Sequence, residues 1–169
     1  MSAASSQPSH RADDVAELAL AEALVQFIRD EIPLARAMDL SLQAASPDQL
    51  SLAVPLAPNV NDKGCAFGGS LVSLMTLAGW ALVELALRRR GDHCDVFVGE
   101  STARYLAPVW SDFRADAQLA PGADWATFFD TLDARGRARI EVACEVPGEP
   151  GKPAATLSVR FVAKRRASH

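Results

Sequence analysis

The chain has 169 residues, of which 49% are hydrophobic and 22% are charged, and this composition predicts one folded domain with its own core. A formal net charge of -4 leaves no basic surface for nucleic acid, and three scattered cysteines with three histidines argue against a disulfide framework or a metal site. The polar start of the chain lacks the shape of a signal peptide, so we expect a cytoplasmic location.

A helix is predicted to follow a short N-terminal tail. Residues 1–12 have no hydrophobic period and are expected to be disordered, so the folded domain should span residues 13–166. Asp14 is followed three residues later by Glu17, as in a capping box, which predicts a helix start there. Apolar residues then recur at helical spacing until Pro33 ends the pattern.

Regular alternation of apolar and polar residues predicts five or six strands. Alternation of this kind is typical of an antiparallel sheet with one buried and one solvated face. The predicted strands lie around residues 40–42, 50–56, 95–106, 113–119, 138–146 and 155–163. The segment 121–134, with Trp125 and Phe128, is predicted to be a short helical connection.

Between the second and third strands, residues 68–90 are predicted to form a long helix. Gly68-Gly69-Ser70 marks its start, and Arg88 to Arg90 followed by Gly91 suit its C-terminal end. Residues 64–83 contain no charge, so the helix is either buried on all sides or lies in lipid. The glycines and hydroxyls within the run favour burial in a core, so we expect no membrane partner.

A long buried helix and a one-faced antiparallel sheet fit together when the sheet curls around the helix. The predicted fold is therefore α+β: a hotdog fold with an extra N-terminal helix. An isolated sheet of this kind leaves an edge strand exposed. We expect a homodimer, or a dimer of dimers, to cover it.

The loop and the helix start carry a resemblance to a known family. The pattern Asn59-x-Asn61-Asp62-x-Gly64-x-x-Phe67-Gly68-Gly69-Ser70, with Gly79-Trp80 further on, resembles the thioesterase-like hotdog family found as the C-terminal domain of YiiD-type proteins. The run Arg104 to Val109 is similar to the strand and turn that follow in many hotdog thioesterases. The resemblance covers roughly residues 34–165.

Two positions depart from the pattern of related hotdog thioesterases. Those relatives carry His-Gly-Gly where this chain has Phe67-Gly68-Gly69, and an acidic residue nine positions after the histidine, where this chain has Thr76. The helix carboxylate that would act as base or nucleophile is therefore missing. Dehydratase chemistry, which needs a histidine and an acid, is disfavoured.

The resemblance assigns candidate catalytic roles. The N–H of Gly68, at the positive end of the helix dipole, would stabilise the oxyanion formed when water attacks a thioester. Asn61 would orient the water, and Asp62 or Glu100, the latter from the opposite subunit, would be the general base. The alternative for Asn61 and Asp62 is a structural role in the turn, and for Glu100 a pair with a neighbouring arginine.

Further residues beside the helix are candidates for substrate binding, although aromatic residues in such stretches are often plain core. These candidates are Phe67, Gly69, Ser70, Thr76, Trp80, Arg104 and Tyr105.

The predicted function is hydrolysis of an acyl thioester of coenzyme A or acyl carrier protein by direct water attack, with no metal or redox cofactor. The alternatives are a non-catalytic acyl-CoA or fatty-acid binding module, which Phe67 and Thr76 favour, and a structural dimerisation domain, which would have no open pocket beside the helix.

Overall fold

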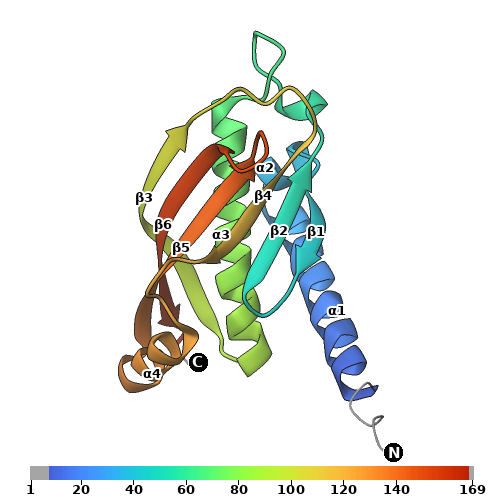
Figure 1. Ribbon diagram of the computed structural model, residues 1–169. Coiled ribbons are helices and arrows are strands. Elements are labelled where there is room, and N and C mark those ends of the chain that lie inside the picture. Colours follow the sequence, from blue (N-terminus) through green and yellow to red (C-terminus); the bar gives the residue numbers. More distant parts are fainter. Residues whose placement is uncertain (1–7, 168–169) are drawn as a thin grey trace, which may run out of the picture.

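The computed structural model describes residues 8–167, and the side chains from residue 13 onward. Six strands form one sheet that curves around a central helix, as predicted for the hotdog fold (Figure 1). In chain order the elements are α1 (Pro8–Glu31), α2 (Pro33–Ala37), β1 (Ser41–Ala45), β2 (Gln49–Val54), a 3-10 turn (Ala57–Asn59), α3 (Gly68–Arg90), β3 (Cys94–Tyr105), β4 (Phe113–Leu119), α4 (Trp125–Arg135), β5 (Arg137–Pro147) and β6 (Pro153–Arg165).

The sheet has the strand order β1-β2-β4-β5-β6-β3, and every neighbouring pair is antiparallel. Long strands β5 and β6 alternate between buried and accessible residues, so one face of the sheet packs on α3 and the other faces outward. The two edges are β1, which α1 packs against, and the twelve-residue β3, most of whose residues are exposed. β3 therefore presents a long unpaired edge.

α3 has the predicted bounds and lies in the core. Its C-terminal end is capped by Gly91, which has a left-handed backbone (φ 74°) and whose N–H donates a hydrogen bond to a carbonyl of the last turn. A Cβ on Gly79 would lie 2.9 Å from the Phe161 ring and 3.1 Å from the sulfur of Cys144, so glycine permits the close approach of helix and sheet. α3 is the one helix within residues 8–167 that is long and apolar enough to span a membrane, but 61% of its apolar window is buried in the fold.

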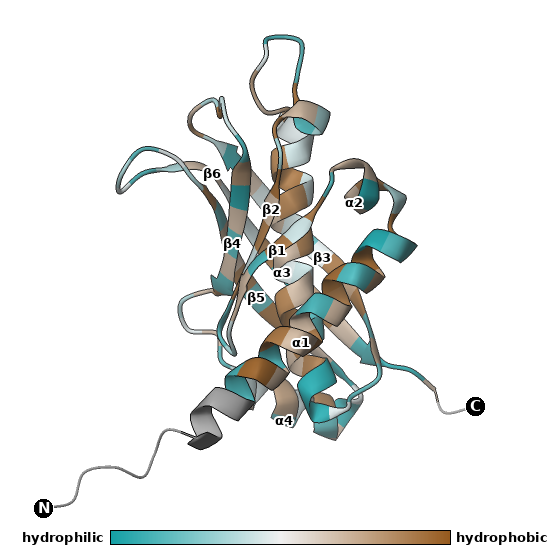
Figure 2. Cartoon of the chain, turned by 90° about the vertical axis from the view of Figure 1, so that its right-hand side faces the viewer, coloured by the Kyte–Doolittle hydropathy of each residue, from teal (hydrophilic) through white to brown (hydrophobic). Residues whose placement is uncertain are grey.

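The N-terminal helix begins earlier than predicted. α1 starts at Pro8, so residues 8–12 of the expected tail continue the helix and the predicted capping box at Asp14 lies inside it; residues 1–7 lie outside the described part of the chain. Helical hydrogen bonding simply continues past Asp14. Ala21, Leu24 and Ile28 form its buried face, whereas its opposite face is mainly hydrophilic (Figure 2). Its Glu17 accepts hydrogen bonds from Arg89 of α3 at 2.6–2.9 Å.

Candidate functional site

The N-terminus of α3 is an uncapped group of backbone donors. Phe67 occupies the N-cap position with an extended backbone, and no side chain caps the helix. The first hydrogen bond of the helix runs from the N–H of Leu71 to the carbonyl of Phe67, at 3.1 Å. The N–H groups of Gly68, Gly69 and Ser70 precede that bond, so they are available to an acceptor at the positive end of the helix dipole.

Two aromatic rings lie beside these donors, and their closeness explains why both positions are glycine. A Cβ on Gly69 would overlap the ring of Phe67, which therefore lies back against the first turn. A Cβ on Gly68 would come within 3.3 Å of the ring of Tyr105, at the end of β3. The structure thus brings Phe67, Gly68, Gly69, Ser70 and Tyr105 together.

Exposed apolar residues extend the rim of this site. Phe67 and Tyr105 are both more than half exposed, and the exposed side chains of Val60, Leu106 and Trp110 come from the two segments that flank it. The carbonyl of Val109 accepts from the N–H of Ala66, which ties those two segments together at 2.8 Å. The sequence analysis missed Leu106 and Trp110; their position just after Tyr105 is the signal that would have found them.

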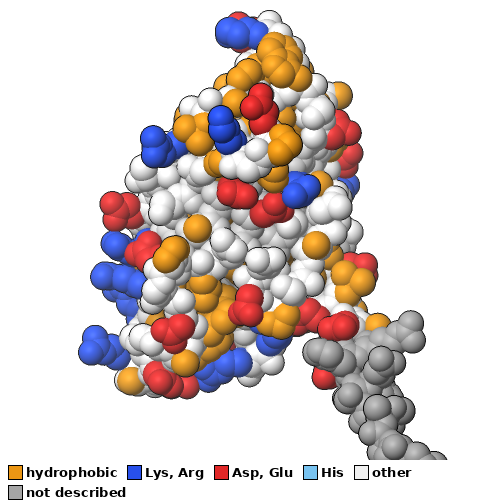
Figure 3. Space-filling model, in the orientation of Figure 1, with side chains coloured by type: hydrophobic (Ala, Val, Ile, Leu, Met, Phe, Trp, Pro, Cys, Tyr) orange, Lys and Arg blue, Asp and Glu red, His pale blue; other side chains and the backbone are white. Residues whose placement is uncertain are grey.

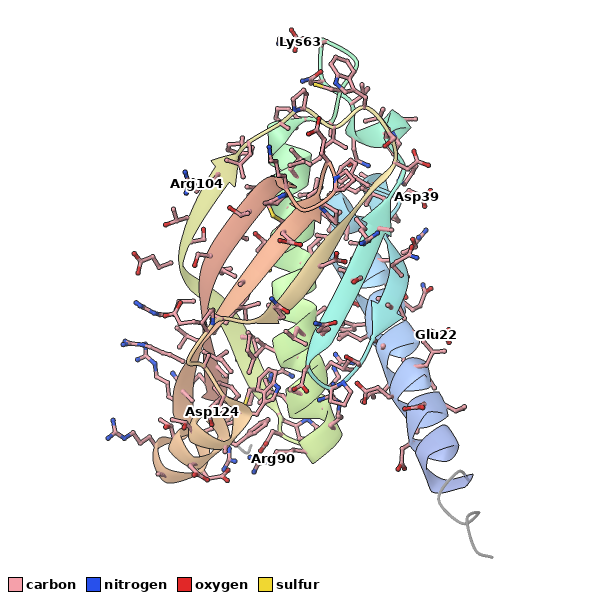
Figure 4. The ribbon with its side chains drawn as sticks, in the orientation of Figure 1. Glu22, Asp39, Lys63, Arg90, Arg104 and Asp124 are labelled. Atoms are coloured by element: carbon pink, nitrogen blue, oxygen red, sulfur yellow. The ribbon has the colours of Figure 1, made fainter. Side chains whose placement is uncertain are left out.

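Asn61 is engaged by its own loop. Its Oδ1 accepts from the N–H of Lys63 at 2.9 Å and from the N–H of Cys65 at 3.2 Å, while its Nδ2 donates to the sulfur of Cys65 at 3.2 Å. This is the turn-forming role that Asn side chains adopt. Asp62, next in the chain, lies at the exposed tip of the loop and pairs with Lys63, which Figure 4 shows at the far end of the molecule.

Asn59 connects the loop to the elements that it packs against. It is buried, its Nδ2 donates to the carbonyls of Met38 (2.9 Å) and Pro55 (2.8 Å), and its own carbonyl accepts from the N–H of Phe67 at 2.8 Å. The side chain of Asn59 therefore joins the end of α2 to the end of β2, and its backbone carbonyl holds the residue that precedes α3. The position of the free N–H groups depends on this junction.

Glu100 lies on the face of the sheet that points away from α3. A bulge between Val98 and Glu100 shifts the register, so Glu100 stands opposite Arg160 and pairs with it at 3.2 Å. Arg160 also donates to Glu141 at 2.5 Å, and these two carboxylates raise the pKa of its guanidinium. Arg104 stands opposite Thr156, on the same outward face. Neither Glu100 nor Arg104 joins the α3 N-terminus of its own subunit.

The remaining candidates follow the half-buried face of α3 away from its N-terminus. Ser73, Thr76 and Trp80 lie along this face, and within the described residues no hydrogen bond engages the hydroxyls of Ser73 or Thr76. The indole Nε1 of Trp80 donates to the carbonyl of Val96 at 3.1 Å, which holds the ring between α3 and the start of β3.

The basic runs at the other end of α3 are already paired. Arg88 bonds Glu84, Arg89 bonds Glu17, and Arg90 bonds Asp133, while near the C-terminus Arg165 bonds Asp92 and Arg166 bonds Asp95. These guanidiniums hold the fold together. Among the described residues, no group of three or more His, Cys, Asp or Glu side chains is arranged to hold a metal ion.

A second hollow lies on the outward face of the sheet. It has a volume of about 730 Å³ and is lined by both uncharged polar and charged residues, among them Ser51, Thr102 and Asp116. Figure 3 shows this face, on which charged side chains of both signs are scattered among uncharged ones. The sheet separates the hollow from α3, so it does not belong to the site at the helix N-terminus.

Comparison with known proteins agrees with this geometry. Residues 21–165 match the model of the family described as "Putative thioesterase (yiiD_Cterm)". The chain belongs to this family. The match covers the sheet, α3 and the C-terminal part of α1, and it includes every candidate residue above.

Several solved structures are similar to this chain over most of its length. A protein of unknown function from Chlorobaculum tepidum is 30% identical with a TM-score of 0.81, over 87% of this chain and 95% of that one. A "putative thioesterase" from Shewanella oneidensis is 27% identical with a TM-score of 0.76, over 86% and 97% of the two chains. A protein from Pseudomonas aeruginosa described as a probable thioesterase, 23% identical over 85% and 95% with a TM-score of 0.71, shares the fold. Family and neighbours together support thioester hydrolysis in general terms.

Proposed function

We propose that this protein hydrolyses an acyl thioester of coenzyme A or acyl carrier protein, with the developing oxyanion held at the N-terminus of α3. The observation that carries the proposal is the uncapped first turn, where the N–H groups of Gly68, Gly69 and Ser70 are free of helical hydrogen bonds and lie between two aromatic rings. Preorganised donors of this kind stabilise the charge that develops on a carbonyl oxygen as water attacks.

Water attacks the carbonyl directly in this proposal. Ser70 and Cys65 have no histidine beside them in sequence to activate them, and the sulfur of Cys65 already accepts from Asn61. The general base in this scheme is the carboxylate of Asp62 or that of Glu100 of the partner subunit, because a carboxylate can take the proton of the attacking water. Asn61, whose side chain is held by its own loop, orients that water. No metal or redox cofactor enters this scheme.

The proposal includes a homodimer formed by two β3 edges. β3 offers twelve residues of backbone that no neighbouring strand covers on one side, and Phe97 and Val98 are exposed on it. Pairing two such edges about a two-fold axis satisfies both and covers the apolar side chains.

The test is steady-state thiol release from a panel of acyl-CoAs by wild type, Gly68→Pro and Gly68→Ala. Proline is tolerated at the first helical position, and the extended backbone of Phe67 suits a following proline, so Gly68→Pro removes one N–H with little change of backbone. Gly68→Ala is the matched control, since it adds a side-chain carbon beside Tyr105 and keeps the N–H. We expect kcat to fall about 10²–10³-fold in the proline variant and far less in the alanine variant.

Equal losses in the two variants would contradict the oxyanion role. Asp62→Asn and Glu100→Gln, measured in the same assay, identify the base. The rival function is a non-catalytic acyl-CoA or fatty-acid binding module, which Phe67 and Thr76 favour because they stand where relatives carry a histidine and an acid. Tight binding of acyl-CoA without turnover would establish the rival.

A further inference from the structure

The outward face of the sheet carries unpaired charges at the hollow described above. Thr156 of β6 stands opposite Arg104 of β3 on one side and Glu145 of β5 on the other, and all three line the hollow. Within residues 13–167, no ion pair engages the guanidinium of Arg104 or the carboxylate of Glu145. The next neighbour of Glu145 is Asp116, a like charge that pairs with Arg114. This end of the face therefore leaves one positive and one negative group without a partner.

The other end of the same face repeats this arrangement with the signs reversed. Lys164 of β6 stands opposite Asp95 of β3 and Arg137 of β5. Arg137 is exposed, and no ion pair engages it in the part of the chain whose side chains are described. Asp95 is half exposed and bonds Arg166 at 2.7 Å. At both ends of the face, opposite charges therefore stand on β3 and β5, on either side of the same β6 residue.

This pattern is complementary to a second copy of itself. β6 lies between β3 and β5 (Figure 1), so a two-fold axis that runs along β6, between two facing sheets, places β3 of each copy over β5 of the other. Arg104 then lies over Glu145 of the second copy, and Asp95 lies over Arg137 of the second copy. The two-fold axis repeats each of these opposite-charge contacts. Facing sheets pack about 10 Å apart, a distance that two long charged side chains can span.

The three rows between these ends are compatible with the same contact. Phe97 and Arg139 stand on either side of Val162, so each exposed ring meets a guanidinium of the second copy, which is a favourable pairing. The next row has small, uncharged side chains that allow close packing: Thr102, Ser158 and Ala143. The middle row is already ion-paired within each copy: Glu100, Arg160 and Glu141.

We propose that this protein self-associates through the outward faces of two sheets, and that the occupant of this face is a second copy of the chain. The inference does not rest on thioester hydrolysis. The contact uses the face of the sheet and leaves the β3 edge free, so two β3-paired dimers assemble face to face into a tetramer. The charges at the two ends of the face fix the register of the contact.

The test measures the mass of the assembly, by light scattering on a sizing column, in wild type, Arg104→Glu, Glu145→Arg and the double variant. Each single change opposes two like charges at one end of the face, twice in each contact, so the mass should halve at the same protein concentration. The double variant exchanges the two charges and should restore the wild-type mass. Arg36→Glu is the control, because it makes the same change of charge at an exposed residue of α2, outside this face.

Three results would overturn the inference: a monomeric wild type, single variants that keep the wild-type mass, or a double variant that stays at half of it. Unchanged mass in the single variants would mean that this face serves another occupant, such as a small polar ligand in the hollow. Thiol release is a separate assay, so none of these results decides the proposed function.

Cross-linking provides a second measurement if a charge variant does not fold. Thr156 lies on the proposed axis, where it meets its own copy, so a short bismaleimide should join two chains of Thr156→Cys. The native cysteines are buried and should not react. Asp48→Cys, in the exposed turn between β1 and β2, lies away from the axis and is the control. A Thr156→Cys variant that is labelled but not joined would contradict the contact.

Discussion

The two ends of α3 are built in opposite ways. The C-terminal end is capped: the N–H groups of Gly91 and Asp92 donate to carbonyls of the last turn, and Arg90 bonds Asp133 and stacks 4.3 Å from the centre of the Phe129 ring. At the N-terminal end no side chain caps the helix, and the neighbouring rings of Phe67 and Tyr105 remain exposed. Satisfied ends stabilise a fold, whereas an uncapped end held in place by its surroundings is suited to bind something else.

The largest effect is expected at the junction that holds the N-terminal end. Asn59→Ala removes two side-chain hydrogen bonds, one to the buried carbonyl of Met38 and one to the partly buried carbonyl of Pro55, so we expect a loss of about 3 kcal/mol in the free energy of unfolding. Urea denaturation measures it. Asn61→Ala, further along the same loop, should lower the free energy of unfolding clearly less. Equal losses in the two variants would contradict the assignment of Asn59 as the residue that holds this junction together.

A methyl group on Gly69 should separate activity from stability. Gly69→Ala displaces the exposed Phe67 ring and crowds the free N–H groups, so we expect kcat/KM to fall about tenfold with little change in Tm. The assay is thiol release alongside a thermal melt. A large drop in Tm with unchanged activity would contradict the assignment of this end to function.

A glycine-to-alanine change at the C-terminal end of α3 should lower stability and leave activity unchanged. Gly91 has a left-handed backbone, and a Cβ there would meet nothing within 4 Å, so Gly91→Ala introduces backbone strain alone. We expect a loss of about 1 kcal/mol of stability and normal kcat/KM. Reduced turnover in a folded variant would mean that the C-terminal end also takes part in the reaction.

The smallest effect concerns pH and the ion pairs of the C-terminal end. The hydrogen bond and charge of Arg90, with those of Arg165, hold the pKa of Asp133 below its ordinary value of 3.8. A lowered folded-state pKa contributes stability above pH 3.8 that is lost as the pH falls through the folded value. The difference in Tm between wild type and Asp133→Asn should therefore shrink as the pH falls below 3.8. A difference in Tm that stays constant over this pH range would contradict an electrostatic contribution of Asp133 to stability.

Local patterns in the sequence were enough to place most elements. The charge-free run after Gly68-Gly69 predicted α3, and alternation predicted the strands, because helical and extended periods depend only on neighbouring residues. The start of α1 was wrong, since a capping-box pattern at Asp14 cannot exclude a helix that continues past it. The sequence predicted that the helix begins at Gly68, which the structure confirms, but it did not predict the direction of the polar side chains in the preceding loop.

Sequence alone determined that this protein has a buried α3 that begins at a glycine pair and a one-faced sheet around it, since these features follow from local composition. Tertiary structure decided which groups remain free. Simple alternation would place Glu100 on the same face as Val96 and Val98, towards α3, but the bulge turns it outward to Arg160. Arg89 and Arg90, at the C-terminal end of α3, are bound to acids distant in the chain, Glu17 and Asp133. Strand register and ion pairing join residues far apart in sequence, so only the folded chain fixes them.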